Sequence, residues 1–169
     1  MGNQQERSLA WLAGVLEAEG SISFQVYTLR DERVRITPYI CLVNTDEAIL
    51  AESRRIMDGL LVGTKNAKTR YCGHGGKNRP CHVIRLDGVS CAVVVSAILP
   101  FMIGEKRRNA EAVLEYIEGR KKGLLLRDTK GRIQRAGYTR AEIELVSSIR
   151  SHKRAKSSEA ICQAPNVVG

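Results

Sequence analysis

Aromatic residues are scarce in this chain, and long hydrophobic runs are missing from it. Phe, Trp and Tyr together make up 5% of the 169 residues, whereas proteins that bind single-stranded nucleic acid stack bases on aromatic side chains. No apolar run approaches the roughly 20 residues that span a bilayer. The opening segment, MGNQQERSLAWLAG, also lacks the charged-then-apolar pattern of a secretory signal. We therefore expect a soluble intracellular protein with no membrane partner.

The cysteines do not form a recognisable framework. There are five of them, an odd number, and without a secretory signal we expect no disulfide scaffold. Four metal-ligating side chains do lie close together in the sequence: Cys72, His74, Cys81 and His82. Their spacing differs from the paired ligand spacings of structural zinc sites, which disfavours zinc. Whether this group binds a metal stays open at this point.

Positive charge is abundant and unevenly distributed. Residues 1–62 hold 6 Lys/Arg and 9 Asp/Glu, a net charge of −3, and residues 63–169 hold 21 and 9, a net charge of +12. This asymmetry favours a polyanionic partner. Charge alone does not separate DNA from RNA or from an acidic membrane surface.

Hydrophobic periodicity predicts an α+β fold with an antiparallel sheet. Apolar residues at helical spacing predict helices over residues 8–18, 46–60, 90–99, 105–120 and 139–150. Alternation of apolar and polar residues predicts two hairpins, with strands over 21–30, 33–44, 64–72 and 81–87. The pattern weakens after residue 120. We expect a core over 1–120, with 121–169 as a C-terminal helical extension and basic tail of the same domain.

The first predicted helix has an unusual face. Ser8 is a plausible N-cap, and Gly20 is a natural C-terminal breaker. Ala10, Gly14 and Ala18 follow one another at steps of four and have almost no side-chain bulk. A glycine inside a helix costs about 1 kcal/mol relative to alanine. Close packing against a second helix would compensate for that cost.

Cations and hydrogen-bonding groups gather on or beside the predicted strands. A two-stranded ribbon fits the major groove of B-DNA, where such side chains read base edges. A polar sheet face that is only solvated is the alternative, and the charge asymmetry favours nucleic acid. The candidate DNA contacts are Ser23, Gln25, Tyr27, Arg30, Arg33, Arg35, Thr37, Tyr39, Asn66, Lys68, Arg70, Arg79 and Arg85.

Residues 12–20, Leu-Ala-Gly-Val-Leu-Glu-Ala-Glu-Gly, resemble the LAGLIDADG motif of homing endonucleases. Residues 44–46 (Asn-Thr-Asp) resemble the family's polar segment between a strand and a helix. Residues 99–101 (Leu-Pro-Phe), followed by 104–108 (Gly-Glu-Lys-Arg-Arg), resemble its late segment with an active-site lysine. The resemblance covers residues 8–120.

The resemblance implies a saddle whose curved antiparallel sheet, with helices packed on it, lies in the DNA major groove. Only one motif is present, so the second motif helix would come from another copy, giving a homodimer with Ala10, Gly14 and Ala18 at its interface. It also implies an intron-encoded endonuclease that hydrolyses phosphodiesters on both strands of a long near-palindromic site and leaves staggered 3′ overhangs. Proteins of this family are found in the cytoplasm or nucleoid of archaea and bacteria or in eukaryotic organelles, and the resemblance implies one of these compartments.

The same resemblance assigns the chemistry. Glu19 matches the acidic position that ligates Mg²⁺, or Mn²⁺ or Ca²⁺ at the same site, and the Ala18 carbonyl is a further metal ligand. Asn44 matches the polar position near the metal, and Lys106 matches the catalytic lysine. Glu19 stands where Asp is commoner, so its arm is one methylene longer. Glu17 points elsewhere on the helix and is interpreted as structural, paired with an Arg or Lys.

Two functions without cleavage remain open on the same fold. One is a DNA-binding regulator that does not cut. The other is a maturase that binds intron RNA and assists splicing. Mg²⁺-dependent cleavage of duplex DNA separates the endonuclease from both.

Overall fold

The computed structural model describes residues 2–28, 34–63, 70–74, 81–123 and 138–149. The chain divides into two compact units, Met1–Lys122 and Gly123–Gly169. The first unit contains the sheet and all of the motif segments, and it is described first.

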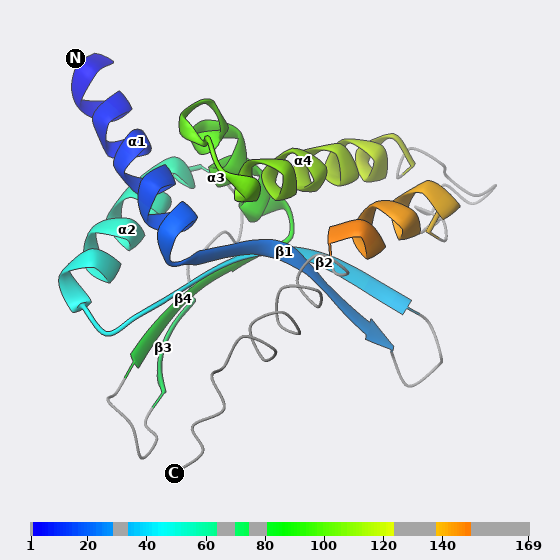
Figure 1. Cartoon of the computed structure of the whole chain (residues 1–169), viewed down its shortest axis with the longest axis horizontal. Helices are drawn as coiled ribbons and strands as arrows, with labels where there is room; N and C mark the ends of the chain where they lie inside the picture. The colour runs from blue at the N-terminus through cyan, green and yellow to red at the C-terminus, as the bar shows by residue number, and fades with distance from the viewer. Residues whose placement is uncertain (1, 29–33, 64–69, 75–80, 124–137, 150–169) are drawn as a thin grey trace, which may run out of the picture. The chain divides into compact units, whose positions relative to one another are not determined.

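The helices and strands of the first unit follow the predicted order (Figure 1). Their bounds are α1 Gly2–Ala18, β1 Gly20–Thr28, β2 Val34–Asn44, α2 Glu47–Leu60, β3 Arg70–His74, β4 Cys81–Asp87, α3 Val89–Ile98, the 3-10 turn η1 Leu99–Phe101 and α4 Glu105–Gly123. This is the expected α+β order of a helix, a hairpin, a helix, a second hairpin and two helices.

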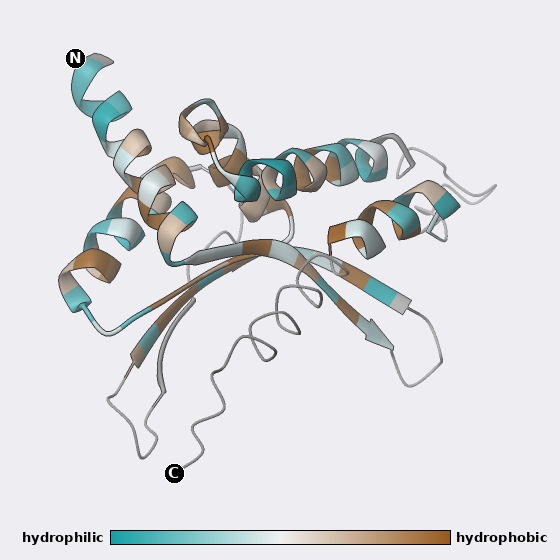
Figure 2. Cartoon of the chain, viewed as in Figure 1, coloured by the Kyte–Doolittle hydropathy of each residue, from teal (hydrophilic) through white to brown (hydrophobic). Residues whose placement is uncertain are grey.

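The strands form one antiparallel sheet in the order β1-β2-β4-β3. Ile22 pairs with Ile40, which in turn pairs with Leu86, so these side chains share one face. All three are almost fully buried. The opposite face carries the alternate residues of each strand, and we call it the outer face. Apolar and polar bands therefore alternate along the strands (Figure 2).

The helices of the first unit cover the apolar face of the sheet (Figure 1). The buried side of α3 consists of Cys91, Val94, Val95 and Ile98, and the helix is apolar over most of its length (Figure 2). From α4, Tyr116 packs edge-on against Phe24 of β1 with ring centroids 5.1 Å apart. Its hydroxyl donates to the Ile36 carbonyl of β2 at 3.2 Å. These contacts fix α3 and α4 over the centre of the sheet.

One predicted helix boundary is wrong. Ser8 is not an N-cap but lies inside α1, where its hydroxyl donates to the Gln4 carbonyl at 3.1 Å. The helix begins six residues earlier than expected because its first residues include good helix formers, although they lack an apolar face. The predicted end of α2 at residue 60 is confirmed: the helix ends at Leu60, and the positive φ of 82° falls at Gly63 in the following turn.

The second unit contains a helix over residues 140–149 in its described part, where a helix over 139–150 was predicted. Thr139 and Glu142 form a reciprocal capping box at its start. The Thr139 amide donates to the Glu142 carboxylate at 2.7 Å, and the Glu142 amide donates to the Thr139 hydroxyl at 3.2 Å. Among the described helices, none combines the length and the apolar character needed to cross a membrane.

Candidate active site and DNA-binding face

The motif residues lie at the junction of α1 and β1. Glu19 is exposed there, and its amide closes the last turn of α1 by donating to the Val15 carbonyl at 2.9 Å. Gly20 begins β1 directly afterwards, tightly against the helix. A Cβ at Gly20 would lie 2.8 Å from the backbone of Leu16, closer than real Cβ atoms come. The glycine therefore allows the sharp turn that leaves the Glu19 carboxylate open to solvent.

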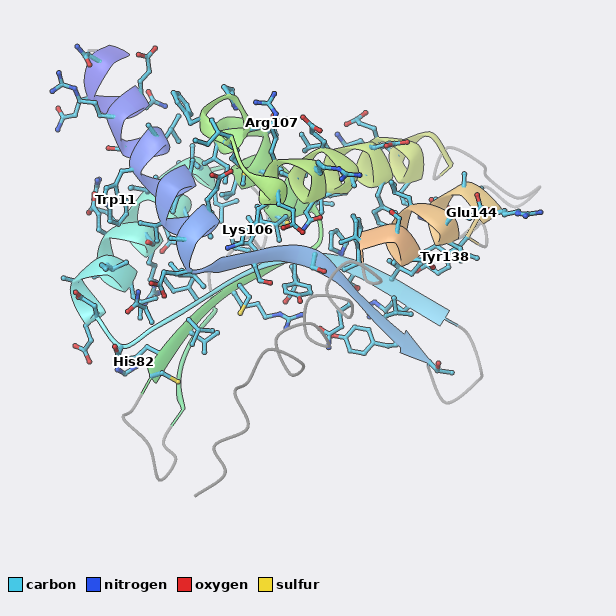
Figure 3. The ribbon with its side chains drawn as sticks, viewed as in Figure 1. Trp11, His82, Lys106, Arg107, Tyr138 and Glu144 are labelled. Atoms are coloured by element: carbon cyan, nitrogen blue, oxygen red, sulfur yellow. The ribbon has the colours of Figure 1, made fainter. Side chains whose placement is uncertain are left out.

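Lys106 reaches this junction from α4 (Figure 3). Its Nζ donates to the carbonyls of Leu16 at 3.0 Å, Glu17 at 2.6 Å and Ala18 at 3.4 Å. The last carbonyls of a helix have no intrahelical partner and carry the negative end of its dipole. The ammonium group therefore stabilises the end of α1, one residue from Glu19.

Glu17 makes a second connection between the same two helices. Its Oε1 accepts from the backbone amides of Ile103 at 2.9 Å and Gly104 at 2.6 Å, just before α4 begins. Its carboxylate lies so close to Gly104 that a Cβ there would be 3.1 Å from Oε2. Glu17 was interpreted as structural, and these contacts have that character. Its observed partners are backbone amides and not the predicted Arg or Lys.

Asn44 lies at the same end of the sheet as Glu19, because Gly20 pairs with Leu42 and Asn44 follows two residues later. Its Oδ1 accepts from the Asp46 amide at 2.9 Å. Asp46 is the N-cap of α2 and accepts from the Ala48 amide at 2.8 Å. The side chain of Asn44 is thus engaged in the turn that starts α2.

The donors at the end of α1 have the right chemistry for a hard divalent cation. Mg²⁺ is usually held by one or two carboxylates together with waters and substrate phosphates. Glu19 offers an exposed carboxylate. The Ala18 carbonyl already accepts from Lys106 Nζ at 3.4 Å, and its second lone pair is the one that could bind a cation. Within the described ranges no group of three or more His, Cys, Asp or Glu residues gathers into a metal cage. A cation held here by Glu19 and Ala18 would need further oxygen ligands, such as waters or a phosphate.

The cysteine and histidine group does not converge in the described part of the chain. His82 Nε2 lies 2.9 Å from Glu47 Oε1 at the start of α2, whereas its neighbour Cys81 alternates to the outer face. The side chains of Cys72 and His74 lie outside the described part of the structure.

The predicted DNA contacts of β1 and β2 share the outer face. Tyr27 and Arg35 are exposed, and Gln25, Thr37 and Tyr39 are partly exposed. Ser23 differs, because only 2% of it is exposed. It pairs directly with Tyr39, and a small side chain beside a large ring is easily covered. Outside the described residues or side chains lie the predicted contacts Arg30, Arg33, Asn66, Lys68, Arg70 and Arg79.

Arg85 contacts three side chains on this face. Its Nε donates to Asp87 Oδ1 at 2.8 Å, its Nη2 donates to Gln25 Oε1, and its guanidinium lies 4.5 Å above the Tyr39 ring. Partial burial alone would lower the pKa of Arg85, but the hydrogen bond and charge of Asp87 outweigh it and raise the pKa. Asp87 was not among the predicted contacts. Its position two residues after Arg85, on the same face of a strand, is the signal that predicts this pair.

The small-residue stripe of α1 is open in the single chain. Ala10, Gly14 and Ala18 are all exposed, and a Cβ added at Gly14 would meet nothing within 4 Å. Trp11, beside the stripe, is 38% exposed (Figure 3). A second helix therefore has access to this side of α1.

Comparison of the fold with solved structures points to one family. I-Vdi141I, an archaeal intron-encoded homing endonuclease complexed with DNA, matches with a TM-score of 0.60 and 20% identity, covering 86% of this chain and 84% of that chain. I-CvuI in complex with its target in the presence of calcium matches with a TM-score of 0.55 and 19% identity, covering 88% and 96%. The homing endonuclease I-TnaI matches with a TM-score of 0.54 and 13% identity, covering 90% and 95%.

No protein-family model matches the chain, and no curated protein matches it. The motif at residues 12–20 lies on α1, where the resemblance requires it, and the sheet has the expected antiparallel arrangement. The resemblance is thus confirmed at the level of the fold: the chain has the fold of the LAGLIDADG homing endonucleases.

Proposed function

We propose that this chain is a site-specific double-stranded DNA endonuclease that depends on a divalent metal and acts as a homodimer. The observation that carries the proposal is the exposed carboxylate of Glu19, held at the end of α1 with the Lys106 ammonium one residue away. The similar structures of I-CvuI and I-Vdi141I are DNA complexes, which supports a duplex substrate. As an intron-encoded protein it would cut both strands and leave staggered 3′ overhangs.

The proposed roles rest on the resemblance of the motif segments, and the positions of the side chains are compatible with them. Glu19 and the Ala18 carbonyl would hold Mg²⁺, or Mn²⁺ or Ca²⁺ in its place, against the scissile phosphate. The cation supplies Lewis-acid stabilisation of the charge that develops on the phosphate oxygens. Lys106 adds a fixed positive charge beside that phosphate, and Asn44 offers an amide at the same end of the sheet. Gly20 allows β1 to start directly beside Leu16 of α1.

The second half of the site would come from a second copy of the chain. In the proposed homodimer, the Ala10, Gly14 and Ala18 stripe packs against its symmetry mate, so two Glu19 carboxylates approach the two-fold axis. Two chains would bring twice the +9 charge of one chain to the duplex. A two-fold protein requires a palindromic or nearly palindromic site.

The test is cleavage of a randomised duplex library by the wild-type chain and two variants, with Mg²⁺ and with EDTA. Glu19→Gln removes the proposed ligand charge, and we expect cleavage to fall about a hundredfold or more. Glu6→Gln is the matched control, because it makes the same change at an exposed glutamate of the same helix. Cuts at one near-palindromic site, lost with Glu19→Gln and with EDTA but kept with Glu6→Gln, support the proposal.

A second candidate is a protein on this fold that binds without cutting. The observation that favours it is that Lys106 and Asn44 are both hydrogen-bonded to the chain's own backbone. Sequence-specific duplex binding with no cut under any divalent cation would identify a DNA-binding regulator. Preference for a structured intron RNA over duplex DNA would identify a maturase instead.

A further inference from the structure

On the outer face, four side chains from three strands contact one another. We call this group the Arg85 cluster: Gln25 of β1, Tyr39 of β2, and Arg85 and Asp87 of β4. We propose that Arg85 reads a guanine in the major groove and that Asp87 is the residue that positions it. This inference rests on the proposed DNA-binding function, and it adds which base is read and by which group.

The contacts of the cluster fix the direction of the guanidinium as well as its place. An arginine has five N–H donors arranged in a planar fork. The edge formed by Nε and Nη2 is occupied, because Nε donates to Asp87 and Nη2 to Gln25. The Tyr39 ring, 4.5 Å away, supports the flat face. The other edge of the guanidinium is formed by Nη1 and the second hydrogen of Nη2. These donors make no hydrogen bond within the described part of the chain, so this edge remains for DNA.

A planar fork held in one orientation matches guanine better than any other base. Guanine presents two adjacent acceptors, O6 and N7, in the major groove, and a bidentate arginine is the commonest specific contact to them. Adenine, cytosine and thymine each lack a second acceptor at that position. The side chain of Arg85 is only 28% exposed, so less rotamer freedom is lost when it binds.

A phosphate contact does not fit the same surroundings. Phosphate binding tolerates many orientations of a cation and gains from net positive charge. Asp87 places a carboxylate 2.8 Å from Nε and offsets the charge of Arg85. An acidic neighbour would repel a phosphate and weaken its binding. A base edge is uncharged, so the carboxylate lowers the binding affinity little there, and it holds the guanidinium in plane. Asp87 therefore indicates base reading.

The experiment is selection of bound duplexes from a randomised library, read by sequencing, without any need for cleavage. The wild-type chain is expected to select a guanine at one position of each half-site. Arg85→Lys keeps the charge but loses the planar fork, and it is expected to reduce the preference for that guanine about tenfold to a hundredfold. Asp87→Asn is expected to reduce it severalfold while total affinity stays the same or rises, because a negative charge is removed from the surface.

A control and a salt series separate the outcomes. Arg55→Lys makes the same change at an exposed arginine of α2 that also pairs with a carboxylate, Glu52, and it should leave the guanine preference intact. If Arg85→Ala instead weakens binding equally for all sequences and lowers the salt slope by about one ion, Arg85 grips phosphate and the inference is overturned. If the wild-type chain selects no duplex sequence at all, the proposed function fails and the inference falls with it. Circular dichroism of each variant confirms that it is folded.

Discussion

Glu17 provides the clearest test of how the α1 end is held in place. Its carboxylate accepts from two backbone amides, at Ile103 and Gly104. A hydrogen bond to a charged group contributes about 1.5–3 kcal/mol. Glu17 is partly exposed, so water replaces part of what is lost, and we reduce the expected total for both bonds to about 1–3 kcal/mol. Glu17→Ala should therefore lower the free energy of unfolding by that amount.

The assay is urea unfolding followed by circular dichroism at neutral pH. For a chain of this size each kcal/mol corresponds to roughly 2–4 °C in Tm, so Glu17→Ala should also melt several degrees lower. Glu17→Gln keeps an acceptor oxygen without its charge and should lose about half as much. Glu6→Ala, at an exposed glutamate of the same helix, should stay within about 0.5 kcal/mol of the wild type. If Glu17→Ala is as mild as Glu6→Ala, Glu17 does not connect α1 to α4 in solution.

Three further predictions concern the same elements. Lys106→Met should cost about 1–2 kcal/mol in urea unfolding, because the cation at the end of α1 is lost; unchanged stability would mean that its contacts with α1 do not persist in solution. Asp46→Ala should cost about 1 kcal/mol by losing the N-cap of α2, and Asp46→Asn should restore most of it. Gly14→Leu should leave a folded chain, because the site is open, but analytical ultracentrifugation should show a monomer; a dimer that survives this change does not use the stripe.

Much of the fold could be predicted because the local signals agree with it. The alternation of apolar residues gives β1, β2 and β4 within a few residues, and the register then buries Ile22, Ile40 and Leu86 together. Thr45 and Asp46 both suit a helix cap by residue type, and in the structure Asp46 caps α2. In each case the interaction that favours the element depends on residues close in sequence, or on the alternation of residues along one strand.

The start of α1 could not be predicted, because the first residues of the helix lack the apolar pattern used to find it. Residues 2–7 have no apolar face, so periodicity gives no sign of a helix, and Ser8 resembled a cap. Helix propensity alone extends α1 there. A helix predicted from its hydrophobic pattern is therefore too short where the end of the helix is exposed on all sides.

The connections of the candidate site could not be predicted because they join distant segments. Glu17 meets Gly104 across 87 residues, and Lys106 meets the Glu17 carbonyl across 89. Gln25 and Arg85 meet across 60 residues. Nothing in the sequence near Glu17 distinguishes a backbone amide partner from an arginine, since both suit a carboxylate. The packing of α4 over the sheet decides between them.

Two features of α1 oppose the rules of helix stability. Gly14 costs about 1 kcal/mol relative to alanine, and within the single chain nothing described lies near enough to compensate for it. Glu19 places an acid just past the C-terminal end of the helix, where the dipole disfavours negative charge. Lys106 offsets the second cost by binding the last carbonyls, but it leaves the carboxylate of Glu19 exposed. Sequences usually depart from local rules where function requires it. In α1 the two departures sit at the open stripe and at the exposed acid, the places where the proposed function needs a second helix and a metal ion.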